Sequence, residues 1–125
     1  MKAACPCGRG APFERCCARY IGTGLPAPDA EMLMRSRYTA FVRGDLAHLL
    51  ASWHASTRPA TLELASGVKW LGLEVRRHAS IDAGHAEVEF VARSRVQGRG
   101  QRLHERSRFV RESGNWYYVD GDILP

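Results

Sequence analysis

The stretch HAEVEFVARSRV, His85–Val96, alternates apolar and polar residues, which is the pattern of a β-strand with one buried face. Three further stretches share this alternation: KWLGLEVRR (Lys69–Arg77), RLHERSRFVRE (Arg102–Glu112) and NWYYVDGDIL (Asn115–Leu124). The turn signals DAGH, QGRG and ESGN separate the four stretches. The sequence therefore predicts four strands that follow one another in an antiparallel meander.

Two helices are predicted ahead of these strands. Asp29 is a good N-cap for the run AEMLMRSRYTAFVR, and Gly44 stands where a helix would stop, so we predict a helix at about residues 30–43. Asp45 can cap a second run, LAHLLASWH, whose large apolar residues recur at the spacing of one buried stripe: Leu46, Leu49, Leu50 and Trp53. Two helices followed by an antiparallel sheet indicate an α+β fold with the helices on one face.

The composition is that of one globular domain with a small appendage. The chain has 125 residues, of which 45% are hydrophobic and 25% charged, so neither disorder nor a fibrous structure is indicated. A net charge of +5 favours acidic partners in general, but the basic residues are scattered along the chain. No apolar run has the length of a signal peptide or a membrane span. We therefore expect a cytoplasmic protein that does not insert into membranes.

All four cysteines lie in the segment CPCGRGAPFERCCARY, Cys5–Tyr20. In a reducing compartment such a cluster binds metal or catalyses more often than it forms disulfides. A bond between the neighbours Cys16 and Cys17 would be strained, and no histidine nearby in sequence would activate a catalytic thiol. The spacing C-x-C-x8-C-C suits the closed tetrahedral coordination of structural zinc, which we prefer over crosswise disulfides or nucleophilic chemistry.

The pattern CPCGRGAPFERCC resembles the SEC-C motif, a small zinc-binding module found at the C-terminus of the preprotein translocase motor subunit. The resemblance spans about the first 22 residues and implies zinc ligation by Cys5, Cys7, Cys16 and Cys17. It also implies a surface for a protein partner, without naming that partner. The run IGTGLPAP, residues 21–28, is predicted to be a linker. We therefore expect a module with its linker at residues 1–24, loosely coupled to a domain at residues 25–125.

The body of the chain also resembles a known family. LMRSRYTAFVRGDLAHLLASWHASTRP, residues 33–59, and NWYYVDG, residues 115–121, are similar to the YchJ-like family of bacterial proteins, which join a SEC-C motif to an NTF2-like, cystatin-like domain. The resemblance covers essentially the whole chain. It implies a cone of helices packed on a curved antiparallel sheet, but it carries over no activity. Such cones serve as enzymes, as ligand binders and as dimerisation modules.

A candidate pocket follows from the expected helix and strand faces. Arg37 shares the apolar face of the first helix with Tyr38, so its buried guanidinium needs a partner. Along the third strand, Glu105 and Ser107 alternate onto the face that points inward. Glu105 is the natural counter-ion for Arg37, and Asp120 is a second candidate. The pair would either fix the helix on the sheet or orient a ligand.

Trp53, His54 and Arg58 complete the candidate pocket at the end of the second helix, where they could bind an anionic or planar ligand. The alternative is that Trp53 is core, His54 caps the helix and Arg58 is solvated. The other histidines show no metal-ligand spacing and are predicted to lie on the surface: His48, His78, His85 and His104.

The leading functional hypothesis is a non-enzymatic zinc-binding protein that binds a protein partner or a small ligand. The alternative is a small acid–base enzyme of the lyase or isomerase type, with Glu105 and His54 as candidate groups but no convincing pair. Nucleic acid comes third, because such a site needs clustered basic residues interleaved with exposed aromatic residues, and the basic strand face formed by Arg102, Arg106 and Arg108 matches this only in part. No residue is assigned a catalytic role.

Overall fold

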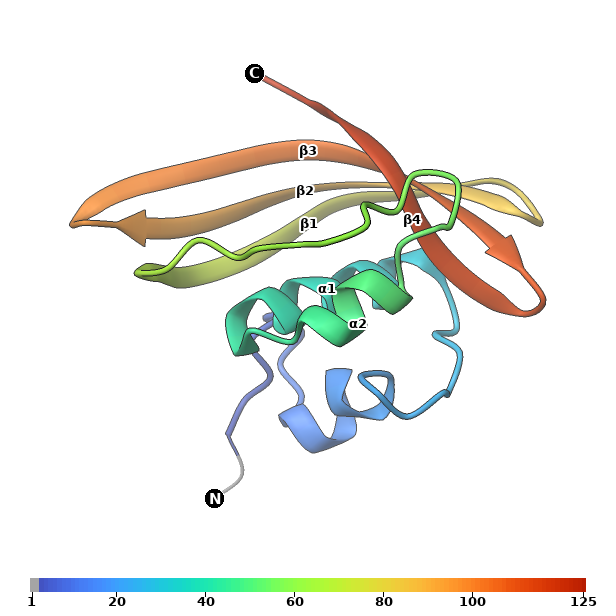
Figure 1. Ribbon diagram of the computed structural model, residues 1–125, viewed down its shortest axis with the longest axis horizontal. Coiled ribbons are helices and arrows are strands. Elements are labelled where there is room, and N and C mark those ends of the chain that lie inside the picture. The colour runs from blue at the N-terminus through green and yellow to red at the C-terminus, as the bar shows by residue number, and fades with distance from the viewer. Residues whose placement is uncertain (1–2) are drawn as a thin grey trace.

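Three layers make up the computed structural model, which describes residues 3–125 (Figure 1). A sheet lies on top, two helices lie beneath it, and the cysteine-rich N-terminal segment lies below the helices. The elements are, in chain order, the 3₁₀ helices η1 (Phe13–Arg15) and η2 (Cys17–Arg19), the helices α1 (Ala30–Arg43) and α2 (Leu46–Ala51), and the strands β1 (Val68–Asp82), β2 (His85–Val96), β3 (Arg99–Glu112) and β4 (Asn115–Ile123). Within the described residues, neither helix is long and apolar enough to cross a membrane.

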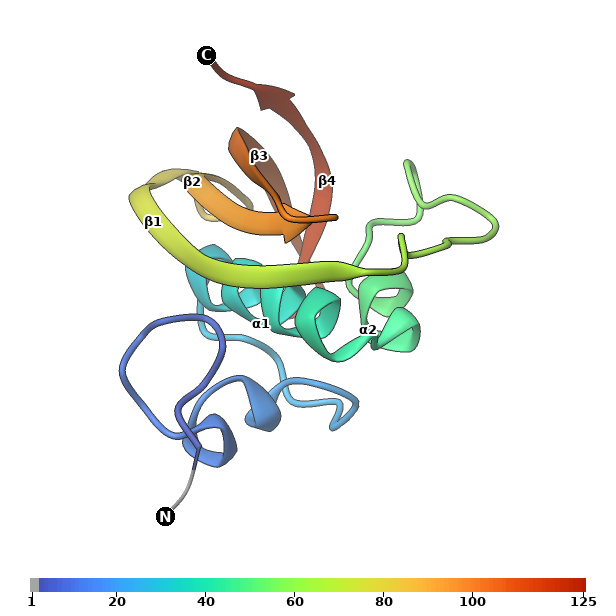
Figure 2. The same cartoon turned by 90° about the vertical axis from the view of Figure 1, so that its left-hand side faces the viewer.

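The sheet confirms the predicted antiparallel meander, with strand order β1-β2-β3-β4. The register of β1 against β2 breaks three times, and each break leaves one extra residue on β1: Leu71, Arg76 and Ile81. Extra residues of this kind bend a strand and increase its twist. The sheet accordingly curves over α1, as Figure 2 shows.

Helix α1 has the predicted bounds and the predicted caps. The Asp29 carboxylate accepts a hydrogen bond of 2.8 Å from the backbone N–H of Met32, which satisfies a free donor of the first turn. Gly44 closes the other end in the left-handed conformation at φ 72°, which a residue without Cβ adopts readily.

Helix α2 is shorter than predicted, and its expected apolar stripe is only partly buried. Leu49 is fully buried, whereas Leu46 is 39% exposed. The helix ends at Ala51 because the next residues pair with β4. Tyr118 donates its backbone N–H to the Ser52 carbonyl at 2.9 Å. That pairing places Trp53 beside β4 instead of on a further helical turn.

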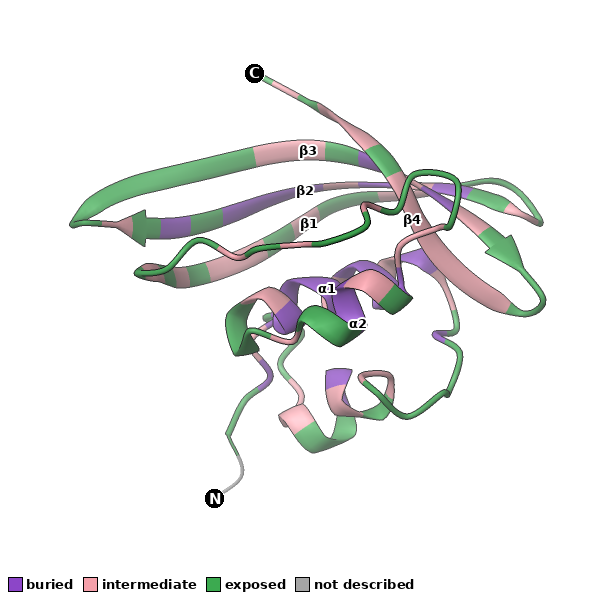
Figure 3. Ribbon diagram, in the orientation of Figure 1, coloured by how far each residue is buried: buried purple, intermediate pink, exposed green. Residues whose placement is uncertain are grey.

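Helix α1 is enclosed on nearly every side, as the burial colours of Figure 3 show. Nine of its 14 residues are buried. Its buried polar residues face different neighbours. Ser36 contacts His48 in α2, Arg37 contacts the end of α2, and Thr39 contacts the cysteines. The helix is therefore the centre of the molecule rather than an amphipathic cover on the sheet.

The prediction that His48 lies on the surface is wrong. This residue of α2 packs its side chain against Ser36 of α1 and is only 8% exposed. The Ser36 hydroxyl donates to the Leu33 carbonyl at 2.7 Å, so at the 2.9 Å Ser36–His48 contact the imidazole Nε2 is the donor. Burial lowers the pKa of His48 below its ordinary value of 6.5, the Arg37 charge lowers it further, and Asp45 opposes the shift. Of the other three histidines, His85 is exposed, whereas His78 and His104 are partly buried.

We expect the free energy of unfolding to fall as the pH falls through 6.5, because below that value the unfolded chain protonates His48 more readily than the folded chain does. The contribution is fully present above pH 6.5. Urea titrations at several pH values should show this slope in the wild type. The slope should be shallower in His48→Gln, which keeps a side-chain N–H donor but does not titrate. Equal slopes would show that His48 is not linked to stability.

Candidate metal centre and adjoining cavity

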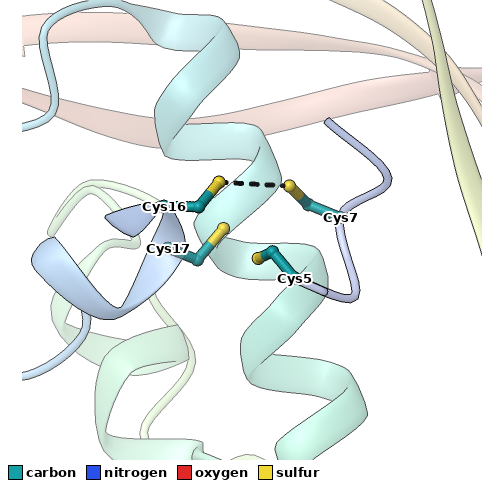
Figure 4. A group of neighbouring side chains, drawn as sticks. All are labelled: Cys5, Cys7, Cys16 and Cys17. Carbon is teal, nitrogen blue, oxygen red and sulfur yellow. Dashed lines mark hydrogen bonds between the residues drawn. The ribbon is translucent and has the colours of Figure 1, made fainter. Parts of the chain in front are cut away.

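The four cysteine side chains point toward one another on the face of α1 (Figure 4). All four are buried, and their sulfur atoms all lie within 4.8 Å of one another. The Cys7 and Cys16 sulfurs are 3.6 Å apart. A tetrahedron with metal–sulfur bonds of about 2.3 Å has edges of about 3.8 Å. The cluster could therefore hold one metal ion with all four thiols as ligands.

The first loop of the segment brings Cys5 and Cys7 into this position. The loop is closed by a 2.9 Å hydrogen bond from the Cys5 N–H to the Ala11 carbonyl. Gly8 turns the chain at φ 78°, and a Cβ at this position would lie 3.2 Å from the Leu73 carbonyl of β1. Glycine is required here both for the turn and for the close approach to the sheet.

The pKa values of the clustered thiols are shifted in opposite directions. Hydrogen bonding from Cys17 is the main reason why the pKa of Cys7 is lowered to about 4. The same contact, together with burial, raises the pKa of Cys17. Metals bind the thiolate form, so the low pKa of Cys7 suits cation binding, whereas Cys16 and Cys17 would have to release their protons to a bound metal.

Side chains of α1 contact the cysteines directly. The Thr39 hydroxyl donates to the Cys17 sulfur at 3.3 Å and lies 3.7 Å from the Cys5 sulfur. Arg35 donates to the Cys7 carbonyl at 2.8 Å. The cysteines belong to the same apolar core as α1 and the sheet. This packing argues against the expected loose coupling between module and body, although the linker is rich in glycine and proline.

We expect Thr39→Val to weaken metal affinity by at least about tenfold while leaving the fold intact. Valine keeps the shape of threonine but removes the hydroxyl that holds the ligand sulfurs, and partners of this kind typically contribute this much to affinity. Competition with a chromophoric chelator measures the change. Thr61→Val, at an exposed position, is the matched control. Equal affinities in the two variants would contradict the role of Thr39.

A cavity of about 230 Å³ lies between α1 and the concave face of the sheet. Five of the predicted pocket residues line it: Arg37, Tyr38, Trp53, Glu105 and Ser107. The prediction omitted the remaining lining residues: Met34, Phe41, Trp70, Phe90, Ala92, Leu103 and Tyr118. Alternation along the second strand could have identified Phe90 and Ala92. The approach of Trp70 depends on the curvature of β1, which alternation does not reveal.

Three predicted pocket residues lie outside this cavity. His54 lies 2.8 Å from the Glu112 carboxylate, and Arg58 donates to the Trp53 carbonyl at 2.9 Å. Asp120 accepts a hydrogen bond of 2.6 Å from Arg108 on the outer face of the sheet. It points outward because the β3–β4 register shifts, leaving Val119 as an extra residue. One extra residue reverses the facing of every residue that follows it.

The predicted counter-ion of Arg37 is also wrong. Among the described residues, no carboxylate lies within 4.0 Å of its guanidinium. Instead Nη1 donates to the Leu49 carbonyl at 2.8 Å and to the Ser52 hydroxyl at 2.7 Å. The guanidinium also lies over the rings of Tyr118, at 4.6 Å, and Trp53, at 5.3 Å. A helix end and two aromatic faces therefore stabilise the charge. Burial lowers the pKa of Arg37 to about 10, and charge interactions with Tyr118 and, at longer range, Glu105 oppose this shift.

Glu105 does face the cavity, as predicted. Its carboxylate accepts a hydrogen bond from the Ser107 hydroxyl. It lies over Gly121 of β4, where a Cβ would come within 2.5 Å of the Glu105 Oε2 atom. The missing side chain of Gly121 thus leaves room for the carboxylate. The cavity has one cationic and one anionic side chain among aromatic walls, and this combination suits a small polar ligand.

The basic strand face is largely neutralised. Arg108 pairs with Asp120 at 2.6 Å and with Asp122 at 2.8 Å, and Arg106 lies 3.4 Å from Asp122. These carboxylates raise the pKa of Arg108, with Asp122 contributing most. Of the three arginines in the predicted basic face, only Arg102 has no salt bridge to a carboxylate among residues 3–125.

Family models match most of the chain. Residues 29–121 match the model described as the YchJ middle NTF2-like domain, and residues 1–19 match the SEC-C motif. The chain is 64% identical to a UPF0225 protein of Methylibium petroleiphilum over 97% of its own length and 89% of the relative's. It is 59% identical to a UPF0225 protein of Polaromonas naphthalenivorans, with 98% of each chain covered.

Two solved structures share the whole arrangement. The solution structure of a SEC-C motif containing protein from Rhodopseudomonas palustris superimposes with a TM-score of 0.86 at 29% identity, covering 100% of both chains. The crystal structure of a SEC-C motif containing protein from Psychrobacter arcticus gives a TM-score of 0.79 at 27% identity, covering 97% of this chain and 82% of that one.

Proposed function

This chain belongs to the YchJ family, in which a SEC-C motif precedes an NTF2-like domain, and from that membership we propose that it is a zinc-stabilised protein that binds a small ligand. The ligand site is the cavity beneath the concave sheet. The observation that carries this proposal is the convergence of Arg37 and Glu105 on a 230 Å³ cavity in which six of the twelve lining residues are aromatic. Ligand sites typically combine apolar walls with a few placed polar groups.

Zinc is the metal that best suits the cysteine cluster. Four thiolates favour zinc among the common ions of a reducing compartment such as the cytoplasm, and four protein ligands leave no open position for water. When bound, the ion would supply folding free energy rather than Lewis-acid catalysis. Thr39 and Arg35 hold the ligand segment against α1, so the ion also fixes the helix that carries Arg37.

Catalysis is the second candidate, and Glu105 is the observation in its favour. A carboxylate inside an aromatic cavity is a reasonable general base. The other predicted group, His54, lies outside the cavity and pairs with Glu112, so it cannot act together with Glu105 in this arrangement. The geometry therefore supports binding better than acid–base chemistry.

A fragment screen by ligand-observed NMR on the zinc-loaded full chain tests the proposal. Leu103 is 38% exposed and lines the cavity, so Leu103→Trp should block its opening. Leu71 is 47% exposed and does not line the cavity, so Leu71→Trp is the matched control. We expect fragments that bind the wild type and Leu71→Trp but not Leu103→Trp. A screen without any fragment of this behaviour would overturn the proposal.

A further inference from the structure

Arg37 has unused hydrogen-bond donors at the cavity. Its side chain is 4% exposed, and both of its hydrogen bonds come from Nη1. Within residues 3–125, Nε and Nη2 have no acceptor, yet every fully enclosed side-chain nitrogen or oxygen in this range has a hydrogen-bond partner. These two nitrogens therefore keep contact with solvent, and Arg37 lines the cavity. Nε and Nη2 form one edge of the guanidinium fork, which matches the two oxygens of a carboxylate.

The walls of the cavity favour a flat ligand. The indole of Trp70 meets the Tyr38 ring edge-on at 5.6 Å and the Phe41 ring at 5.9 Å, and Trp53 meets Tyr118 at 5.2 Å. Rings held in this way offer rigid faces and edges to another planar group. The volume of 230 Å³ is below the roughly 300 Å³ at which sites for drug-sized ligands begin, so the ligand is small.

Glu105 restricts the negative charge that a ligand can carry and requires the ligand to have a hydrogen-bond donor. Arg37 and Glu105 are the only charged residues that line the cavity among those the structure describes. A dianion such as a phosphate ester would have one cation available and would be repelled by Glu105. The Ser107 hydroxyl uses one acceptor site of Glu105, and a carboxylate has about four. A ligand hydroxyl or amine would donate to one of the remaining sites.

We infer that the cavity binds a small planar monocarboxylic acid that carries a hydrogen-bond donor away from its carboxylate. The carboxylate binds the Nε and Nη2 edge of Arg37, and the donor binds Glu105. The flat body lies against the aromatic walls. This inference rests on the proposed function, because it names the ligand class of the same cavity.

Isothermal titration calorimetry with four probes tests the ligand class on the zinc-loaded full chain. The probes are 3-hydroxybenzoate, 4-hydroxybenzoate, benzoate and 4-hydroxybenzamide. We expect one hydroxybenzoate to bind at least about tenfold more tightly than benzoate, because benzoate leaves Glu105 without a donor. The benzamide should bind about 100-fold more weakly than its acid, because it lacks the charge that pairs with Arg37.

Two variants and one control test which residue binds each end of the ligand. Arg37→Lys keeps the charge but loses the fork, so hydroxybenzoate affinity should fall at least about tenfold in a protein whose NMR spectrum stays folded. Glu105→Gln should reduce the preference for hydroxybenzoate over benzoate. Glu112→Gln is the control, because Glu112 pairs with His54 outside the cavity and should leave both affinities unchanged.

The outcomes separate this inference from the proposed function. Equal binding of the acid and the benzamide, or an unchanged affinity in Arg37→Lys, would overturn the assignment of Arg37 as the carboxylate site. If none of the four probes binds at millimolar concentration but other fragments bind the wild type and not Leu103→Trp, the ligand class is wrong and the proposed function stands. If no fragment of any class binds in the cavity, both fail.

Discussion

Chelation of the bound metal is expected to unfold the sheet together with the N-terminal segment. The four cysteines belong to the same core as α1 and the sheet, and the Thr39 hydroxyl of α1 donates to the Cys17 sulfur. Structural zinc contributes about 10–16 kcal/mol of apparent binding free energy, whereas a domain of this size has a net stability of about 5–15 kcal/mol. Removing the ion should therefore remove most of the net stability.

Two-dimensional NMR measures this outcome directly. Amide signals of β2 and β3, the two central strands, should lose dispersion in step with those of the cysteine segment as chelator is added. Adding zinc back should restore both sets, which controls for damage by the chelator. Strand signals that persist after the cysteine-segment signals have collapsed would show that the two parts unfold independently, as the linker composition had suggested.

Arg37→Met is expected to destabilise the protein by about 2–4 kcal/mol. The substitution leaves the Leu49 carbonyl and the Ser52 hydroxyl without their charged donor, and each loss of this kind amounts to about 1–3 kcal/mol. Removal of a buried charge offsets part of the loss. Arg43→Met is the matched control on the same helix. Arg43 is exposed and lies over Phe13 at 4.4 Å, so its loss should amount to less than about 1 kcal/mol.

Double-mutant cycles in urea denaturation identify the partner of Arg37. Coupling with Ser52→Ala should approach about 1 kcal/mol, because the two side chains share a hydrogen bond. Coupling with Glu105→Gln should stay below about 0.5 kcal/mol, because no hydrogen bond or ion pair within 4.0 Å joins those side chains among the described residues. A larger coupling with Glu105→Gln than with Ser52→Ala would support the Arg37–Glu105 ion pair that strand alternation suggested.

Local signals in the sequence were sufficient for most of the fold. Asp29 and Gly44 fix the two ends of α1 through bonds within a few residues, and the three turn signals fix the order of the strands. The clustering of the cysteines was also predictable, because their spacing is confined to one short segment. These features depend on neighbours in the chain, which a sequence displays directly.

Features that depend on distant contacts were not predictable. His48 is buried because Ser36 of another helix accepts its N–H, and Arg37 donates to a carbonyl 12 residues away instead of pairing with a carboxylate. The Asp120 prediction failed because one extra residue in β4 reversed the alternation on which it relied. Thr39 is 22 residues from the sulfur that it contacts. No pattern within a single element indicates any of these pairings.

The extra residues of β1 have a consequence beyond the curvature of the sheet. A long strand at the edge of a sheet can act as a template for the strand of another molecule. The three breaks leave no uninterrupted paired run longer than four residues in β1, whereas cross-β stacking between chains needs about six. Gly8 also brings the N-terminal loop against the Leu73 carbonyl. The same irregularities that bend the sheet over its cavity therefore protect the protein against amyloid-like self-association.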